Sequence, residues 1–318
     1  MLETMQQGSE LVSRLSSLIP WHGKEAIQPA AQRFNHPSNG DDGAVIPNPT
    51  GPGWLVLAAQ GMTEDFLKID PWFAGWSAVM ANISDITAMG GYPSATVDVH
   101  WLCSEAALDG IAAAAEAFAV PVVGGHSGAT QGNAHLAVAM IGHTMAPLHG
   151  NAAQAGDDLI AVIDQRGQWR GDFPFWNAAT TAPVERLRGD YALVPQLAEE
   201  GLLHCGRDIS MGGIYQTAAL IAEQSQTCLS IDPLRVPGVD QENEVSQQER
   251  RLLCFPSFGF LFAVKNECSH QVIQRFGERD LCARVVGIVE PGPARVTAKL
   301  GDESITLRDI SSSPLTGF

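Results

Sequence analysis

Apolar and polar positions follow helical spacing in some stretches of the chain and strand spacing in others. Residues 9–19 repeat apolar side chains every three or four positions, which predicts an amphipathic helix. Residues 71–89 are apolar almost throughout and predict a long packed helix, with Pro71 in its first turn. The other predicted helices are 105–118 and 213–221, and the predicted strands are 53–59, 95–101, 136–141, 159–163, 258–264 and 283–289. Strands and helices alternate in both halves, so we expect an α/β (α+β) fold in two layered domains rather than one helical bundle.

The segment Pro147-Leu148-His149-Gly150-Asn151 is the predicted domain junction. We therefore expect an N-terminal helix and arm over 1–35, a first domain over 36–150 and a second domain over 151–318. Residues 165–200 mix Trp, Gly and Arg and predict helices joined by a loop, while the polar residues 237–250 predict an exposed loop or turn.

Composition narrows the class of protein. With 318 residues, 45% hydrophobic and 17% charged, the chain is predicted to be a soluble globular protein with room for two cores. Its net charge of −16 argues against nucleic acid and anionic membranes as partners, but nucleotides that carry their own metal remain compatible. No apolar run reaches membrane-spanning length, and residues 1–4 lack the features of a signal peptide. Six scattered cysteines predict reduced thiols in a cytoplasmic protein and argue against a zinc site.

One acidic side chain, Asp85, stands inside the small and apolar segment 76–91. Burying a carboxylate there costs several kcal/mol unless it is paired or binds a metal. The segment offers no basic partner, and Lys68 is the only Lys or Arg between Arg33 and Arg166. Hard oxygen ligands suit Mg²⁺, which bridges carboxylates to substrate phosphates. The pattern therefore predicts a divalent cation at Asp42 and Asp85. The alternative is a solvated acidic face, which we prefer for Glu64, Asp65 and Asp70.

Three segments combine acidic or polar residues with small ones beside a helix or strand end, namely 39–44, 82–91 and 208–213. A fourth, residues 122–127, reads as a strand that ends in a glycine turn. Glycines in such a place let backbone N–H groups approach phosphate oxygens closely.

In this order and at these separations, the four segments resemble the AIR synthase-related (PurM-like) superfamily. Its members include aminoimidazole ribonucleotide synthase, thiamine-monophosphate kinase, selenophosphate synthase and a hydrogenase maturation factor. The resemblance covers about residues 36–310. Residues 69–93 are most similar to thiamine-monophosphate kinase and selenophosphate synthase, and Gly124-Gly125-His126-Ser127 is similar to the latter, because kinases of this family usually have an acid at the position of His126. The chain looks like a less-studied AIR synthase-like branch.

The resemblance implies an ATP-dependent enzyme with Mg²⁺ as its metal. Its fold would pair an N-terminal sheet, covered by helices on one face, with a C-terminal α/β domain, and it would be a homodimer through the N-terminal sheets. By motif position, Asp42 and Asp85 would be metal ligands from the first domain and Asp208 from the second. Asp208 could instead be a helix cap. Asp41 would either bind metal or hold the loop.

The resemblance also implies nucleotide contacts. Gly124 and Gly125 would give backbone N–H groups to ATP, while Asn82 and Ser210 would lie near the nucleotide. Lys24 could reach the γ-phosphate, although a solvated lysine is the simpler interpretation. The candidate catalytic residue is His126, which would act near substrate or phosphate, with a structural histidine as the alternative.

Departures from the family pattern bear on the chemistry. Gln60 stands where the family usually has an Asp, and Met211 stands where thiamine-monophosphate kinase has a second acid. Together with His126, these residues predict fewer metals or a different metal arrangement. Selenium chemistry is disfavoured because no Cys precedes Cys103.

The resulting hypothesis is ATP- and Mg²⁺-dependent phosphoryl transfer to a small-molecule acceptor, or phosphate activation of it, as in thiamine-monophosphate kinase. The alternatives are a selenophosphate-synthase-like or cyclo-ligase-like ATP enzyme, a nucleotide-binding protein without turnover, and a structural dimer whose acids are caps.

Overall fold

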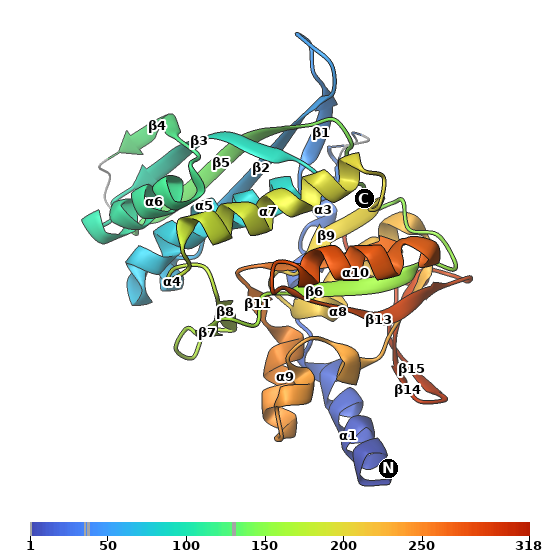
Figure 1. The fold of residues 1–318 in the computed structure, drawn as a ribbon. Coiled ribbons are helices and arrows are strands. Elements are labelled where there is room, and N and C mark those ends of the chain that lie inside the picture. Colours follow the sequence, from blue (N-terminus) through green and yellow to red (C-terminus); the bar gives the residue numbers. More distant parts are fainter. Residues whose placement is uncertain (1, 35, 37–38, 129–131) are drawn as a thin grey trace. The chain divides into compact units, whose positions relative to one another are not determined.

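The computed structural model describes residues 2–34, 36, 39–128 and 132–318 (Figure 1). The chain forms two compact units, and neither is a continuous piece of sequence. We call one the five-stranded unit (Asp42–Pro147 and Ala182–Glu199) and the other the seven-stranded unit (Met1–Asp41, Leu148–Thr181 and Glu200–Phe318). The chain passes from the five-stranded unit to the seven-stranded unit between residues 147 and 148, three residues before the predicted domain boundary at 150/151.

The five-stranded unit has its helices on one face of its sheet. The strand order is β1-β2-β5-β3-β4, and all pairs are antiparallel except the parallel pair β3/β4. Helix α5 lies against the sheet, and α6 and α7 pack on α5 (Figure 1). Its elements are β1 (Ala44–Pro47), β2 (Trp54–Met62), α4 (Glu64–Ile69), α5 (Pro71–Ala88), β3 (Tyr92–Trp101), α6 (Glu105–Phe118), β4 (Val122–Gly128), β5 (His135–Thr144) and α7 (Val184–Glu199).

Helix α5 is buried on every side, as the continuous apolar run predicts. The Asp70 side chain caps it by accepting the Phe73 N–H at 3.2 Å, and Pro71 occupies its first turn. Every residue from Phe73 to Ala88 is buried. Two glycines let α5 and α6 approach closely, because a Cβ at Gly75 or Gly110 would lie about 2 Å from a carbonyl oxygen of the other helix.

The opposite face of this sheet is apolar and open within the five-stranded unit. Side chains alternate along a strand, so Val56 and Ala58 face α5 while Leu57 points away and is 41% exposed. On the same open side, Val97 is 37% and Val123 65% exposed. We call this surface the open sheet face; it contains a hollow of about 430 Å³ lined by Leu57, Ala58, Ala59, Ala95, Thr96, Val97, Val123, Ala139, Met140 and Ile141.

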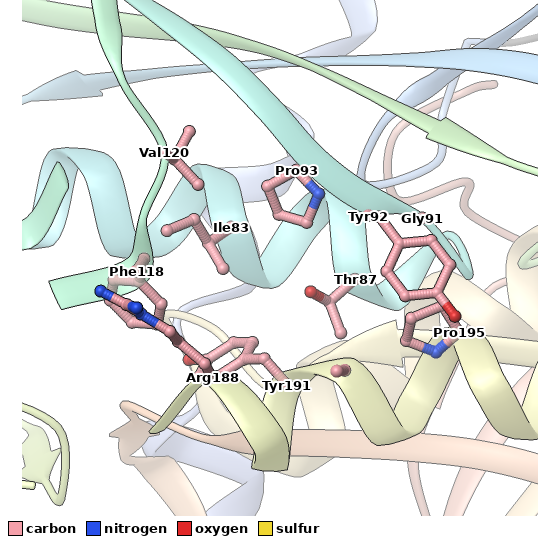
Figure 2. Close-up of a pocket in the computed structure, with 11 residues that line it drawn as sticks. Ile83, Thr87, Gly91, Tyr92, Pro93, Phe118, Val120, Arg188, Tyr191 and Pro195 are labelled. Carbon is pink, nitrogen blue, oxygen red and sulfur yellow. The ribbon is translucent and has the colours of Figure 1, made fainter. Parts of the chain in front are cut away.

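A smaller cavity of about 140 Å³ lies between α5, the start of β3 and α7. Figure 2 shows Ile83 and Thr87 of α5 on one side of it and Tyr191 and Pro195 of α7 on the other. Thr87 is fully buried, and its hydroxyl has no hydrogen-bond partner among the described residues. Such a hydroxyl has given up its hydration without compensation, so Thr87 is a local cost to stability.

Thr87→Val is therefore expected to raise the free energy of unfolding by about 1 kcal/mol, because it removes the unpaired hydroxyl and keeps the side-chain shape. Denaturant unfolding followed by circular dichroism measures the change. The matched control is Thr144→Val, because the equally buried Thr144 hydroxyl donates to Gly90 O at 2.6 Å. That variant is expected to lose stability. A loss for Thr87→Val as large as that for Thr144→Val would contradict the assignment.

The seven-stranded unit has the strand order β15-β14-β10-β13-β6-β12-β9. Within this seven-stranded sheet, β10 and β14 pair in parallel and the other neighbours are antiparallel. The strands are β6 (Asp158–Ile163), β9 (Cys205–Asp208), β10 (Cys228–Ile231), β12 (Gly259–Val264), β13 (Cys282–Glu290), β14 (Arg295–Leu300) and β15 (Glu303–Asp309), and the α-helices are α1 (Leu2–Leu18), α2 (Trp21–Glu25), α3 (Gln28–Ala31), α8 (Gly213–Ser225), α9 (Val245–Leu253) and α10 (Ser269–Gly277). A three-stranded sheet of β7 (Gln168–Trp169), β8 (Phe175–Asn177) and β11 (Phe255–Pro256) and the 3₁₀ turns η1 (Pro233–Arg235), η2 (Val239–Gln241) and η3 (Asn266–Cys268) complete it.

The predicted N-terminal helix exists as α1, but it is part of this unit's core rather than a separate arm. Leu11, Val12 and Leu15 are fully buried in one cluster with side chains of β10, β14 and α8. Conversely, α7 lies within the predicted second domain in sequence but packs on α5 and α6 of the five-stranded unit. Both differences arise because an amphipathic helix buries its apolar side wherever a sheet or helix face is open, whatever the sequence order.

Residues 237–250 were expected to form an exposed loop, and the structure corrects this. They contain η2 and most of α9, and Gln248, Glu249 and Arg251 on α9 are buried. The Arg251 guanidinium lies 3.7 Å from the ring centroid of Trp176, which covers it. Polar residues here pack through cation–aromatic and ionic contacts that a hydropathy pattern does not reveal.

All six cysteines are free thiols, as predicted, and burial raises the pKa of Cys205 and Cys254 to about 12. No helix among the described residues is both long and apolar enough to cross a membrane.

Candidate metal and nucleotide site

Asp42 and Asp85 come together in the five-stranded unit. Asp42 lies two residues before β1, and Asp85 projects from α5 with 4% of its surface exposed. Each offers a carboxylate oxygen, and these two atoms lie within 4.8 Å of one another. Oxygens around an octahedral Mg²⁺ sit about 2.0–2.1 Å from the ion and so at most about 4.2 Å apart. A small side-chain adjustment would let both acids bind one ion.

Gln60 on β2 holds Asp85 in place. Its amide nitrogen donates to Asp85 Oδ2 at 2.7 Å. This contact orients the Asp85 carboxylate, because a carboxylate accepts hydrogen bonds through its oxygens. The amide is neutral, and it therefore does not offset the charge on Asp85.

Two cations of this unit, Lys68 and Arg188, have partners away from the acid pair. Lys68 forms an ion pair with Glu64. The Arg188 guanidinium donates to the carbonyl oxygens of Glu116 and Ala117 at 2.7 and 2.8 Å, at the end of α6. Two nearby carboxylates repel each other in a partly buried setting, so Asp42 and Asp85 form an arrangement that a divalent cation would stabilise.

Asp41 belongs to the other unit, although it is adjacent to Asp42 in sequence. Its Oδ1 accepts the Gly150 N–H at 2.9 Å and lies 3.7 Å from the Arg207 guanidinium. His149 Nδ1 lies 3.6 Å from Oδ2. These contacts tie the segment at 149–150 to β9 and favour the loop-holding alternative for Asp41.

Asp208 ends β9 and is 5% exposed. Its backbone carbonyl accepts the Thr217 hydroxyl at 3.1 Å, which fixes the strand end to α8. The connection passes through Ser210, which is half-buried, and Met211, which is 52% exposed and fills no core. Gly213 begins α8 with a φ of +70°, and a Cβ there would lie 1.9 Å from the Leu252 carbonyl oxygen, so only glycine fits.

The glycine pair of residues 124–125 lies within strand β4, not in a turn after a strand. The strand continues to Gly128 and pairs in parallel with β3 at the sheet edge. A Cβ at Gly125 would lie 2.5 Å from Asp98 Oδ1, whereas a Cβ at Gly124 would meet nothing within 4 Å. Packing against Asp98 thus explains Gly125, and backbone contacts of this pair with ATP stay a prediction.

His126 is exposed on β4, with its ring centroid 5.9 Å from that of Trp101. One neighbouring pair escaped the sequence reasoning: His100 Nδ1 lies 2.5 Å from Asp98 Oδ2 on β3. Residues two apart on a strand share a face, so the Asp98-Val99-His100 spacing could have indicated this contact.

Asn82 has a packing role in the structure. It is fully buried, and its amide donates to Ala78 O at 2.7 Å and to Val138 O of β5 at 3.0 Å. These bonds join α5 to the sheet and use both amide hydrogens, whereas Asn82 Oδ1 has no hydrogen-bond partner among the described residues. A contact of Asn82 with a nucleotide stays a prediction. Lys24 lies on the short helix α2 of the seven-stranded unit and is half-buried.

Comparison with known proteins places this geometry in a family. Two family models match the chain, the AIR synthase related protein N-terminal domain over residues 40–144 and the C-terminal domain over residues 179–299. An uncharacterized protein of Synechocystis is 40% identical over 287 residues, 88% of this chain and 86% of that protein. Thiamine-monophosphate kinase of Synechococcus elongatus is 24% identical over 313 residues, 89% of this chain and 93% of the kinase.

A solved structure supports the fold. PurL of T. maritima complexed with ATP is similar with a TM-score of 0.74 at 15% identity, over 94% of this chain and 52% of the PurL chain. The fold and the sequence matches define a two-domain α/β protein of the AIR synthase type, as the sequence predicts. The chain belongs to the AIR synthase related family.

Proposed function

We propose that the protein catalyses ATP- and Mg²⁺-dependent phosphoryl transfer to a small-molecule acceptor, or activates that acceptor through phosphate. The observation that carries the proposal is the Asp42–Asp85 carboxylate pair, whose oxygens lie within 4.8 Å on a unit with few cations. The similarity to a kinase and to a structure solved with ATP adds support. Phosphoryl transfer asks mainly for positioning and charge neutralisation, which such a site can provide.

We assign the roles as follows. Asp42 and Asp85 would hold Mg²⁺. The metal-ligand role of Asp208, which its position in the family motif implies, stays a prediction. Bound Mg²⁺ would neutralise charge on the nucleotide phosphates. Ser210 and the N–H groups of Gly124 and Gly125 would contact the nucleotide, and His126 would act near the acceptor.

The experiment is titration calorimetry of purified protein with ATP in the presence of Mg²⁺ and in EDTA. Binding that requires Mg²⁺ is the expected result, and ATP binding that is absent or indifferent to Mg²⁺ would overturn the proposal. The protein is then incubated with ATP, Mg²⁺ and metabolite mixtures, and the production of ADP is measured. Tight binding without ADP would favour a second candidate, nucleotide binding without turnover, for which Gln60 and Met211 are the motivation.

We further infer that Gln60 limits the number of metals. An Asp at this position would bring a third carboxylate toward Asp42 and Asp85, whereas the amide donates to Asp85 and adds no charge. Gln60→Asp should therefore lower thermal stability in EDTA and gain more stability from Mg²⁺ than the wild type. One additional Mg²⁺ ion, present at about 100 times its Kd, stabilises the folded protein by about 2.7 kcal/mol. The Mg²⁺-dependent rise in Tm of the Asp variant should therefore exceed that of the wild type by about 2 °C or more.

Gln60→Asn is the matched control, because it shortens the side chain equally and stays neutral. Thermal melts with and without Mg²⁺ compare the two variants. Equal Mg²⁺-dependent shifts for the Asp and Asn variants would show that the charge at position 60 does not set metal binding.

Homodimerisation through the open sheet face is part of the proposal. The residues that line its hollow include no Lys, Arg, Asp or Glu. A two-fold contact places identical patches together, so an uncharged apolar patch suits self-association in a protein with a net charge of −16.

A further inference from the structure

Two buried hydroxyl groups lie side by side on the seven-stranded sheet. Ser230 on β10 and Thr297 on β14 are register partners in the parallel pair. They are 2% and 4% exposed, and neither hydroxyl oxygen has a hydrogen-bond partner among the described residues. Their chain neighbours Leu229, Ile231, Val296 and Ala298 belong to the hydrophobic core, so by alternation the hydroxyls face the other side of the sheet.

That side of the sheet contains a hollow, and Ser230 lines it. Its volume is about 360 Å³, within the range of about 300–1,000 Å³ that is typical of small-molecule sites. Gly287 on β13 also lines the hollow and has no side chain to fill it. A Cβ at this position would lie 1.9 Å from Ser230 O. Two buried, unpaired hydroxyls on neighbouring strands beside such a hollow need a polar partner, because each costs free energy when left unpaired.

Four charged side chains also line the hollow. Arg235 and Lys299 are exposed, and neither has a carboxylate within ion-pair distance in the described part of the chain. The acids are Asp158, whose Oδ2 accepts from Asn266 and Ser269, and Asp232, whose Oδ1 accepts the Leu234 N–H. Asp232 is half-buried, and desolvation raises its pKa above the ordinary value, against the lowering by the Leu234 N–H and Arg235. The hollow thus carries two positive and two negative groups.

This balance selects the chemistry of the occupant. A simple anion would meet Arg235 and Lys299 favourably but would be repelled by the two acids. A metal cation would be attracted by the two acids but repelled by Arg235 and Lys299. A molecule with both a carboxylate and an ammonium group matches both pairs and also supplies acceptors and donors for the Ser230 and Thr297 hydroxyls.

We propose that the hollow beside Ser230 and Thr297 binds a small zwitterion of the amino-acid class. Its carboxylate interacts with Arg235, Lys299 and the two hydroxyls, and its ammonium group interacts with Asp232 and Asp158. All of these residues belong to the seven-stranded unit, and none of them has a role in the function proposed above, so the two proposals are independent.

The test uses the full chain without ATP or Mg²⁺. A thermal-shift screen of the twenty standard L-amino acids selects the strongest ligand, and titration calorimetry measures its Kd. Acetate, methylammonium and inorganic phosphate are titrated beside it. We expect an amino acid to bind at least tenfold more tightly than any of these three, because each of them matches only one pair of charges. If no amino acid binds, or if acetate or phosphate binds equally tightly, the proposal is wrong.

Variants locate the binding. Lys299→Met should weaken amino-acid binding at least tenfold. Because Lys299 is exposed, the substitution should not change the stability of the fold. Lys265→Met, which removes an exposed lysine of the same unit outside the hollow, is the matched control and should bind normally. Thr297→Val should weaken binding while the Tm of the free protein stays equal or rises, since the unpaired hydroxyl is removed without loss of shape. Unchanged affinity in Lys299→Met and Thr297→Val would place any observed binding elsewhere and overturn the assignment.

Discussion

Asp85→Asn is expected to weaken Mg²⁺-dependent ATP binding by tenfold or more, about 1.4 kcal/mol. The substitution keeps the side-chain shape, and its amide oxygen can still accept the hydrogen bond from Gln60. What it removes is the negative charge that a metal requires from its ligand. The same change removes a charge that is 96% buried, so the protein without metal should be as stable as the wild type or more stable. Calorimetry and thermal melts measure these two effects.

Opposite changes in stability and in binding separate a metal ligand from a structural acid. Asp109→Asn is the matched control, because Asp109 is exposed on α6 of the same unit and loses the same charge without touching the pair. Its ATP affinity should equal that of the wild type. If Asp85→Asn binds Mg²⁺ and ATP normally, Asp42 and Asp85 are ordinary structural acids. That result would favour the alternative hypothesis of a structural dimer.

The sequence predicts α5 and the importance of Asp85 because both follow from local rules. A proline in the first turn and an unbroken apolar run specify a helix that is buried all round, and a lone acid within it is conspicuous. The hydrogen bond from Gln60 could not be predicted, because it joins β2 to α5 across 25 residues. It depends on how the helix is rotated against the sheet, which the pattern of either element alone does not specify.

Neighbours in sequence also separate in the structure. Asp41 and Asp42 form one acidic pair in the sequence, yet they lie in different units: Asp41 accepts the Gly150 N–H, while an oxygen of Asp42 lies within 4.8 Å of one of Asp85. Likewise, Glu223 on α8 binds the C-terminal segment, accepting the N–H groups of Leu315, Thr316 and Gly317. Contacts over such distances along the chain arise from tertiary packing, so periodicity and composition carry no sign of them.

Helix α9 shows the limit of hydropathy. Residues 245–253 are too polar to indicate burial, but Arg251 lies over Trp176, and Glu249 pairs with Arg14 of α1 at 2.5 Å. The aliphatic stems of long polar residues cover apolar surface while their charged ends find partners. The hydropathy pattern of such a polar helix therefore predicts an exposed loop, because the buried contacts of its polar side chains are not visible in the sequence.

Val97→Lys is expected to convert a dimer of twice 33.9 kDa into monomers, measured by light scattering after gel filtration at micromolar concentration. Val97 lies on β3 in the open sheet face, next to strands β4 and β5. In a two-fold contact both copies would bury the new ammonium group in an apolar surface without a carboxylate among the lining residues. An unpaired charge in such a place costs several kcal/mol, which corresponds to a loss of affinity of more than 100-fold.

Ile69→Lys is the matched control, because Ile69 is 68% exposed on α4 and lies outside the hollow. It makes the same apolar-to-lysine change and should leave the mass doubled. A wild-type protein that is monomeric at these concentrations would contradict the dimer, and a Val97→Lys variant that keeps the doubled mass would place the interface on another surface. The open sheet face would then expose its apolar area to water, a patch that a stable monomer rarely tolerates.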